Sequence, residues 1–214
     1  LARITNKAKI IILGNVLPIW DDPLWLAEQL SMIDMISHGR LVSGFVRGGG
    51  RESYAHNSPP HFNRERFEEA HDFIIKAWTD SGPFRWEGKH YHFRVVNPFQ
   101  VPLQKPHPPV ILGGTARNVL QRVARWGDGG LPSQVTPSQI EESRKILDTL
   151  AAERGRDPKS ITISIFGLPP DTNRDQVEAL LNASADRVAV WLSHCETETE
   201  MGEELERMAD ALVR

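Results

Sequence analysis

Cysteine is almost missing from this chain: Cys195 is the only one in 214 residues. A single cysteine cannot form an intrachain disulfide, which excludes the small disulfide-stapled folds and favours a reducing compartment. The sequence also lacks an apolar run of membrane-spanning length. Residues 1–7 contain neither a methionine nor the apolar core of a signal peptide. We therefore expect a cytoplasmic protein that does not act at a membrane.

An excess of positive charge is missing as well. The chain has 25 Lys and Arg against 28 Asp and Glu, for a net charge of -3. Such a balance gives no basic footprint for nucleic acid. Hydrophobic content of 40% and charged content of 25% are ordinary for a globular protein. The composition therefore favours a small-molecule substrate over a nucleic acid or a membrane as the main partner.

What the sequence does contain is a regular alternation of short apolar runs and amphipathic stretches. Six buried strands are predicted, each followed by a helix, at residues 9–13, 40–47, 110–112, around 131, 161–166 and 187–192. The predicted helix caps are Asp21 or Asp22, Asn63, Thr115, Thr136, Asn173 and Thr197. Repeated βα units predict a parallel sheet, either closed into a barrel or doubly wound.

The predicted strands all end in glycine or in polar residues. These strand ends are Gly14-Asn15, Arg47-Gly48, Gly113-Gly114, Ser133-Gln134, Gly167 and Ser193. Such residues gathered at one rim are typical of the ligand-binding end of a (β/α)8 barrel. A doubly wound sheet would instead concentrate its ligand loops at one switch point. The pattern therefore favours the barrel.

Residues 51–108 interrupt the alternation. Residues 51–60 are predicted to be loop, followed by a helix from Asn63, a hairpin turning at residues 87–89 and a proline-rich extended segment. A connection this long is usually functional, such as a lid or one wall of a site. Tyr54 and His56 lie in it and are candidates to face a substrate, with solvated loop residues as the alternative. His90 and His92 have no second ligand pair at metal-site spacing, so we expect no metal.

Five short motifs, taken together, indicate a family. They are residues 34–41 (DMISHGRL) continuing to Gly48, 64–69 (RERFEE), 86–89 (WEGK), 106–109 (PHPP) and 127–129 (GDG). In this order and spacing they resemble the bacterial luciferase-like flavin oxidoreductases. The resemblance implies a single (β/α)8 barrel domain over residues 1–214, with 51–108 as a lid-like insertion. It also implies FMN or a deazaflavin coenzyme as cofactor.

The resemblance further implies roles for particular residues. Gly14, Asn15 and Val16 match a strand-end bulge that supports the flavin ring, often through a non-proline cis peptide. Arg47 and Gly48 match the position beside the pyrimidine side of the ring, with a surface salt-bridge arginine as the alternative for Arg47. The backbone cradle beside the cofactor and its phosphate or ribityl chain corresponds to Leu112, Gly113, Gly114, Thr115, Ser133 and Gln134. No catalytic acid or base is identified.

The chain also departs from the family pattern. Its first predicted strand resembles the family's third, so about six of eight βα units are expected. Two strand edges, at residues 9–13 and 187–192, would then be unpaired, which predicts either association into a homo-oligomer or low stability. The resemblance implies a monooxygenase that uses reduced FMN and molecular oxygen, with a separate flavin reductase as a partner. The alternatives are deazaflavin-dependent hydride transfer and a non-catalytic truncated subunit.

Overall fold

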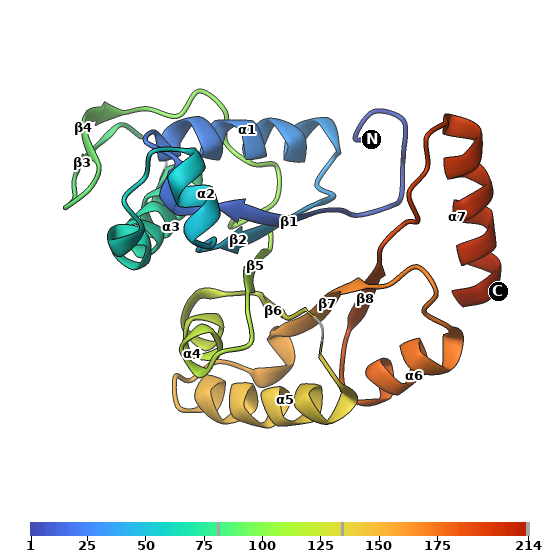
Figure 1. The fold of residues 1–214 in the computed structure, drawn as a ribbon. Helices are drawn as coiled ribbons and strands as arrows, with labels where there is room; N and C mark the ends of the chain where they lie inside the picture. Colours follow the sequence, from blue (N-terminus) through green and yellow to red (C-terminus); the bar gives the residue numbers. More distant parts are fainter. Residues whose placement is uncertain (81, 134, 213–214) are drawn as a thin grey trace. The chain divides into compact units, whose positions relative to one another are not determined.

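The computed structural model describes residues 1–80, 82–133 and 135–212. It divides into two compact units, Leu1–Ile111 and Leu112–Arg214, which are described separately below. Figure 1 labels the helices and strands of both units.

Unit 1 begins with a βαβ arrangement. Strands β1 (Ile10–Val16) and β2 (Leu41–Val46) pair in parallel and are joined by η1 (Leu17–Ile19) and α1 (Pro23–Ile36). Asp22 caps α1, because its carboxylate accepts hydrogen bonds from the backbone N–H groups of Leu24 and Trp25, at 2.9 and 3.2 Å. This confirms one of the two predicted caps. β1 continues three residues beyond the predicted strand end.

The segment after β2 is more ordered than predicted. Residues 51–60 were expected to be loop, but α2 (Gly50–Ala55) and η2 (Pro60–Phe62) lie there. The physical reason is the Glu52 carboxylate, which accepts the Gly49 N–H at 2.9 Å and so closes the start of a short helix. The cap predicted for α3 (Asn63–Thr79) is also wrong, because Phe62 occupies the N-cap. Asn63 instead donates to the Ser53 hydroxyl at 2.6 Å, which ties α2 to α3.

The hairpin is confirmed as β3 (Phe84–Glu87) paired antiparallel with β4 (His92–Val96). Its turn is attached to α3 by one carboxylate. Glu69 accepts the backbone N–H groups of Lys89, His90 and Tyr91 at 3.1, 2.9 and 2.9 Å. An indole N–H from Trp86 reaches the same carboxylate at 3.2 Å. A side chain of α3 therefore fixes the hairpin.

Strand β5 (Val110–Gly113) spans the boundary between the units. In unit 1 the strand order is β1-β2-β5, and the Ser43 N–H donates to Pro109 O at 2.8 Å beside the start of β5. In unit 2 the order is β5-β6-β7-β8. The strands that follow β5 are β6 (Gly129–Leu131), β7 (Thr162–Leu168) and β8 (Arg187–Val190).

The remaining helices follow the strands of unit 2, as the alternation predicted. They are α4 (Arg117–Trp126), α5 (Pro137–Ala152), η3 (Pro158–Ser160), α6 (Arg174–Asn182) and α7 (Glu198–Leu212). The predicted caps Thr136, Asn173 and Thr197 are confirmed by bonds to Gln139, Gln176 and Glu200. Thr115 was the wrong cap for α4. Ala116 takes that position, and no side chain bonds the first turn.

Candidate functional site

At the carboxyl end of β1 the strand carries a bulge. Ile12 is paired with Ser43, but the next pair is Asn15 with Phe45, so β1 has one residue more than β2 across this stretch. Gly44 makes room for the extra residue, since a Cβ there would lie only 2.4 Å from the carbonyl oxygen of Ile12. The sequence reasoning missed Gly44, although a glycine inside an apolar strand is a recognised signal of a bulge or a close backbone approach.

The Asn15 side chain is used within the bulge itself. Its amide donates to Gly44 O at 3.2 Å and to the Ser43 hydroxyl at 3.4 Å. Asn15 therefore faces β2, while the neighbouring Gly14 is exposed. Over the described residues the one cis peptide bond precedes Pro106, so the cis peptide expected at residues 14–16 is not found there. The bulge is held by a side-chain amide and by Gly44.

Beyond β2, Arg47 and Gly48 lie at the same strand end. Arg47 is exposed and, within the described part of the chain, its guanidinium has no hydrogen-bond or ion-pair partner. This gives no support to the salt-bridge alternative. Gly48 has φ +72°, and a Cβ there would lie 2.4 Å from Cγ1 of Val16. Only glycine suits this position, which brings the ends of β1 and β2 into contact.

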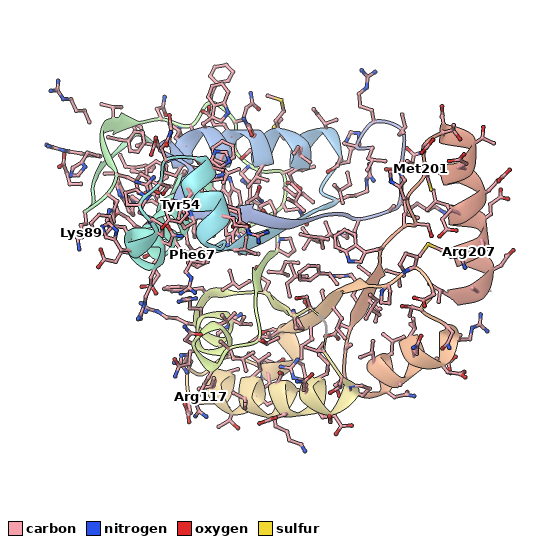
Figure 2. All side chains as sticks on the ribbon, in the orientation of Figure 1. Tyr54, Phe67, Lys89, Arg117, Met201 and Arg207 are labelled. Atoms are coloured by element: carbon pink, nitrogen blue, oxygen red, sulfur yellow. The ribbon has the colours of Figure 1, made fainter. Side chains whose placement is uncertain are left out.

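Tyr54 and His56 lie close in sequence to this strand end. Tyr54 projects from α2 with 76% of its surface exposed (Figure 2). His56 is the exposed C-cap residue of α2. The structure puts both side chains on the surface of unit 1, where a substrate-facing role stays a prediction.

Unit 2 has a hollow of about 410 Å³ at the carboxyl ends of β5 and β6. It brings together Thr115 and Ser133, which the sequence reasoning placed in separate loops. Arg117, labelled in Figure 2, also lines it and was not predicted. The available signal was a basic residue in the first turn of the helix that follows a glycine-rich strand end. The other lining residues are Leu120, Val135, Gln139, Glu142, Ser143 and Ile146.

The other residues predicted to bind the cofactor in unit 2 offer backbone groups and not side chains. Leu112 is 2% exposed, so its side chain belongs to the core. Gly113 is half-buried, and Gly114 is exposed with φ +122°, a conformation that a residue with a side chain rarely adopts. The Gly114 N–H already donates to Leu131 O at 3.2 Å. Gln134, which was also predicted to lie here, is outside the described residues.

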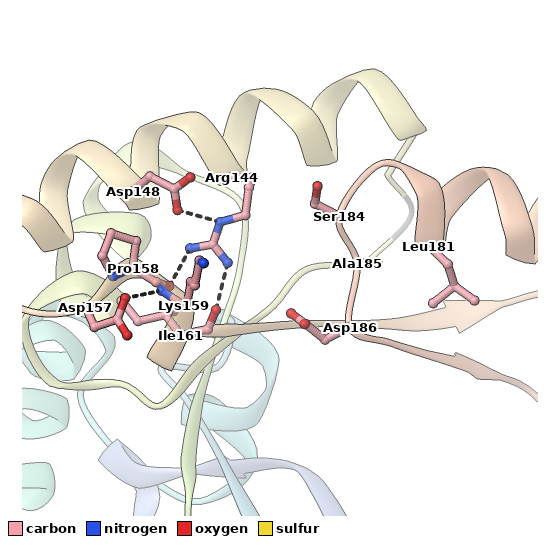
Figure 3. A pocket seen from close by; sticks show the side chains of 10 residues that line it. All are labelled: Arg144, Asp148, Asp157, Pro158, Lys159, Ile161, Leu181, Ser184, Ala185 and Asp186. Atoms are coloured by element: carbon pink, nitrogen blue, oxygen red, sulfur yellow. Dashed lines mark hydrogen bonds and ion pairs between the residues drawn. The ribbon is translucent and has the colours of Figure 1, made fainter.

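A larger hollow of about 610 Å³ lies at the amino ends of β7 and β8 (Figure 3). Several of its charged groups serve the fold. Arg144 donates to Asp148 at 2.8 Å and to Ile161 O at 2.7 Å. The Asp157 carboxylate accepts a hydrogen bond from the backbone N–H of Lys159 at 3.0 Å. Because these groups are already paired, and because barrel proteins place function at the carboxyl ends of their strands, we do not assign this hollow to the functional site.

Two further observations concern metal binding and membrane-spanning helices. Among the described residues, no group of three or more His, Cys, Asp and Glu side chains is arranged to hold a metal ion. In the same part of the chain, no helix combines the length and the apolar character that crossing a membrane requires.

Several known proteins resemble this chain in sequence. Residues 2–212 match the family model of luciferase-like monooxygenases. An FMNH(2)-dependent dimethylsulfone monooxygenase of Pseudomonas putida is 32% identical over 199 residues, which cover 87% of this chain and 52% of that protein. An uncharacterised protein of Mycobacterium bovis is 30% identical over 175 residues, covering 78% and 60%. The chain therefore spans about half the length of the curated relatives it matches.

Solved structures show the same fold. Monooxygenase RslO1 from Streptomyces bottropensis superimposes with a TM-score of 0.81 at 19% identity, covering 99% of this chain and 79% of that one. The coenzyme F420-dependent tetrahydromethanopterin reductase of Methanopyrus kandleri gives a TM-score of 0.79 at 18% identity, covering 99% and 84%. The predicted fold class is thereby confirmed: an α/β fold of the (β/α)8 type, with about six of the eight βα units in this chain.

Proposed function

We propose that this chain, which belongs to the luciferase-like monooxygenase family, binds a flavin at the carboxyl ends of its strands as part of an oxidoreductase. In its most specific form the proposal is a monooxygenase that acts on a small organic substrate with reduced FMN and molecular oxygen. A separate flavin reductase would supply the reduced FMN. The name of the Pseudomonas putida relative, an FMNH(2)-dependent monooxygenase, supports this choice of cofactor.

The observation that carries the proposal is the hollow beside β5 and β6. Thr115 and Ser133 offer hydroxyl donors there, and Arg117 offers a guanidinium. Arginine and hydroxyl groups recognise phosphate oxygens well, and Arg117 opens α4, whose N-terminus adds a favourable partial charge. The carboxylate of Glu142 lies in the same hollow and opposes an anion. The set suits the phosphate of FMN or of a deazaflavin coenzyme.

In unit 1 the proposed contribution is to the flavin ring. The exposed backbone at Gly14 and the glycine at position 48 would allow a flat group to approach closely. Arg47 would hydrogen-bond a ring carbonyl and stabilise negative charge on the reduced ring. The flavin, once bound, supplies the redox chemistry, while the chain binds it, orients it and excludes water.

Deazaflavin-dependent hydride transfer is the second candidate. Its support is that similar folds include enzymes described as F420-dependent, among them a secondary alcohol dehydrogenase with a TM-score of 0.77 at 13% identity. The phosphate hollow does not distinguish the two cofactors, because both carry phosphate. A non-catalytic subunit is the third reading of the same fold.

Titration of the chain with FMN and with a deazaflavin coenzyme, followed by absorbance and fluorescence, tests the proposal. We expect saturable binding of at least one of them. Arg117→Gln should weaken that binding about tenfold or more, because it removes a charge-assisted contact of about 1.5–3 kcal/mol. Arg125→Gln is the matched control on the same helix, since Arg125 packs over the Trp126 ring at 4.7 Å and does not line the hollow.

Two further outcomes sharpen the test. Glu142→Gln should strengthen binding, because it removes the opposing carboxylate from the hollow. Binding of neither cofactor by a chain that circular dichroism shows to be folded would refute the proposal and leave the non-catalytic subunit as the remaining interpretation.

A further inference from the structure

Trp191 lies directly after β8 with much of its side chain open to solvent. Its backbone N–H donates to Leu168 O at 2.8 Å, so the chain stays paired with β7 as far as this residue. The residue is nevertheless 53% exposed. Tryptophan is highly buried on average in folded proteins. An indole this open at the carboxyl end of a barrel strand is therefore a candidate to contact a ligand.

The side chains of β8 show which way Trp191 faces. Val188, Val190 and Leu192 line a hollow of about 350 Å³ together with residues of α6 and α7. Because successive side chains of a strand point to opposite faces, Trp191 points away from these helices. In a (β/α)8 fold the helices surround the strands, so the face away from them is the barrel interior. Trp191 thus stands on the interior face, at the end where barrel proteins bind ligands.

A bulge in β7 brings the indole against a glycine. Between Ile165 and Leu168, β7 has one residue more than the paired stretch of β8. Gly167 lies in this bulge with φ +83°, and a Cβ there would be only 3.2 Å from Nε1 of Trp191. Bulges next to active sites commonly re-aim a side chain. Here the bulge leaves a space without a side chain, and the indole occupies it.

The same glycine connects Trp191 with the proposed phosphate hollow. Ser133, which lines that hollow, pairs with Phe166 of β7 in an isolated bridge. The Cβ of Ser133 lies 4.0 Å from the position that a Cβ of Gly167 would take. The ends of β6, β7 and β8 therefore bring together a hydroxyl, a bare stretch of backbone and an exposed indole. This combination suits a ligand that joins a phosphate to a flat ring.

We propose that the Trp191 indole packs against the flavin ring and helps to fix its position. The inference rests on the proposed function, because it takes the phosphate to lie beside Ser133 and Arg117. Flat aromatic groups attract one another beyond the gain from burying their area. The contact is to the ring and not to the phosphate, so its effect on binding is separable from that of Arg117.

Titration of the parent chain and of Trp191→Leu with FMN and with riboflavin tests the proposal. Trp191→Leu should weaken the binding of both flavins by about threefold to tenfold, the range that an aromatic stack contributes. Arg117→Gln, in contrast, should weaken the binding of FMN alone. Trp25→Leu is the matched control, because Trp25 is 60% exposed on α1, and it should change neither affinity. Unchanged affinities in Trp191→Leu would overturn the inference and leave the proposed function standing.

Flavin fluorescence supplies a readout that a purely structural role of Trp191 would not move. An indole in contact with a flavin quenches its emission by electron transfer, so FMN bound to the parent chain should emit weakly. FMN that saturates Trp191→Leu should emit several-fold more strongly. Trp191→Phe should restore the affinity but not the quenching, because phenylalanine stacks without donating an electron.

Two outcomes of the fluorescence experiment count against the inference. Equal emission of bound FMN in the parent chain and in Trp191→Leu would exclude the contact between indole and ring. A folded parent chain that binds neither FMN nor riboflavin would refute the choice of FMN in the proposed function, and this inference with it.

Discussion

Among single residues, Gly44 has the clearest structural consequence. A Cβ at this position would meet the carbonyl oxygens of Ile12 and Leu13 at 2.4 and 2.5 Å, both of them backbone atoms that cannot swing away. We therefore expect Gly44→Ala to displace the β1 bulge, lowering the melting temperature and weakening flavin binding together. Gly202→Ala is the control, because nothing lies within 4 Å of its Cβ position. An unchanged melting temperature in Gly44→Ala would contradict the tight packing of the bulge.

For Arg47 we expect an effect on flavin binding without an effect on stability. It is exposed at the end of β2 and outside the core, so Arg47→Ala should weaken FMN binding while leaving the melting temperature unchanged. Arg94→Ala, at an exposed position of β4, should alter neither quantity. Parallel FMN titrations and thermal melts of the three proteins supply the check. Equal FMN affinities would reduce Arg47 to a surface charge.

The site residues differ in how well the sequence alone could predict them. Thr115 and Ser133 could be predicted because each lies two residues after a strand, and parallel strands end at one edge of a sheet. The sequence places Arg117 in the first turn of α4, but its position in the hollow also depends on how α4 packs beside α5. The positive φ of Gly114 also adds strain to any substitution there. A Gly114→Val variant would consequently report on stability as well as on binding.

Among the elements, the β3–β4 hairpin depends on one side chain of α3. Glu69 accepts three backbone N–H groups of the turn and the Trp86 indole N–H. Glu69→Ala should lower the free energy of unfolding of unit 1 by about 2–3 kcal/mol, because these donors lose a charged acceptor. Glu68→Ala removes the neighbouring carboxylate, which pairs with the exposed Arg64 at 3.4 Å, and it should cost less than Glu69→Ala. Urea denaturation of both variants measures the difference.

Helix α7 has no buried residue among those described, and polar contacts help to hold it. The Arg207 guanidinium, followed by the Ser193 hydroxyl, lowers the pKa of Glu204 to about 2. A carboxyl whose folded-state pKa is lowered stabilises the fold above its ordinary pKa of 4.5, and that stabilisation is lost as the pH falls through about 2. Side-chain NMR of Glu204 should therefore show an apparent pKa near 2. A value near 4.5 would show that the Arg207 contact does not persist in solution.

Element prediction succeeded where local signals were complete. Thr136-Pro137 with Gln139, and Asn173 with Gln176, are self-contained cap signals, and both helices begin where expected. α2 failed because its first turn is closed by Glu52 across a run of glycines, which resembles a loop in sequence. The periodicity of α1 marks its apolar positions, but it does not say which of them meet the core of unit 1: Leu26 is 2% exposed, whereas Trp25 is 60% exposed.

For the whole molecule, the strand order leaves β1 and β8 as end strands. The sequence predicted unpaired edges at these two places, with self-association or low stability as the consequence. Such edges are templates for pairing with another chain. A single domain over residues 1–214 remains a prediction.

The central claim is that the hollow at the ends of β5 and β6 holds the phosphate of a flavin. Comparing the affinities of FMN and riboflavin, which lacks the phosphate, tests this claim most directly. The parent chain should bind FMN at least tenfold more tightly than riboflavin, and this preference should disappear in Arg117→Gln but persist in Arg125→Gln. Equal affinity of the parent chain for the two flavins, or an undiminished preference in Arg117→Gln, would contradict the account.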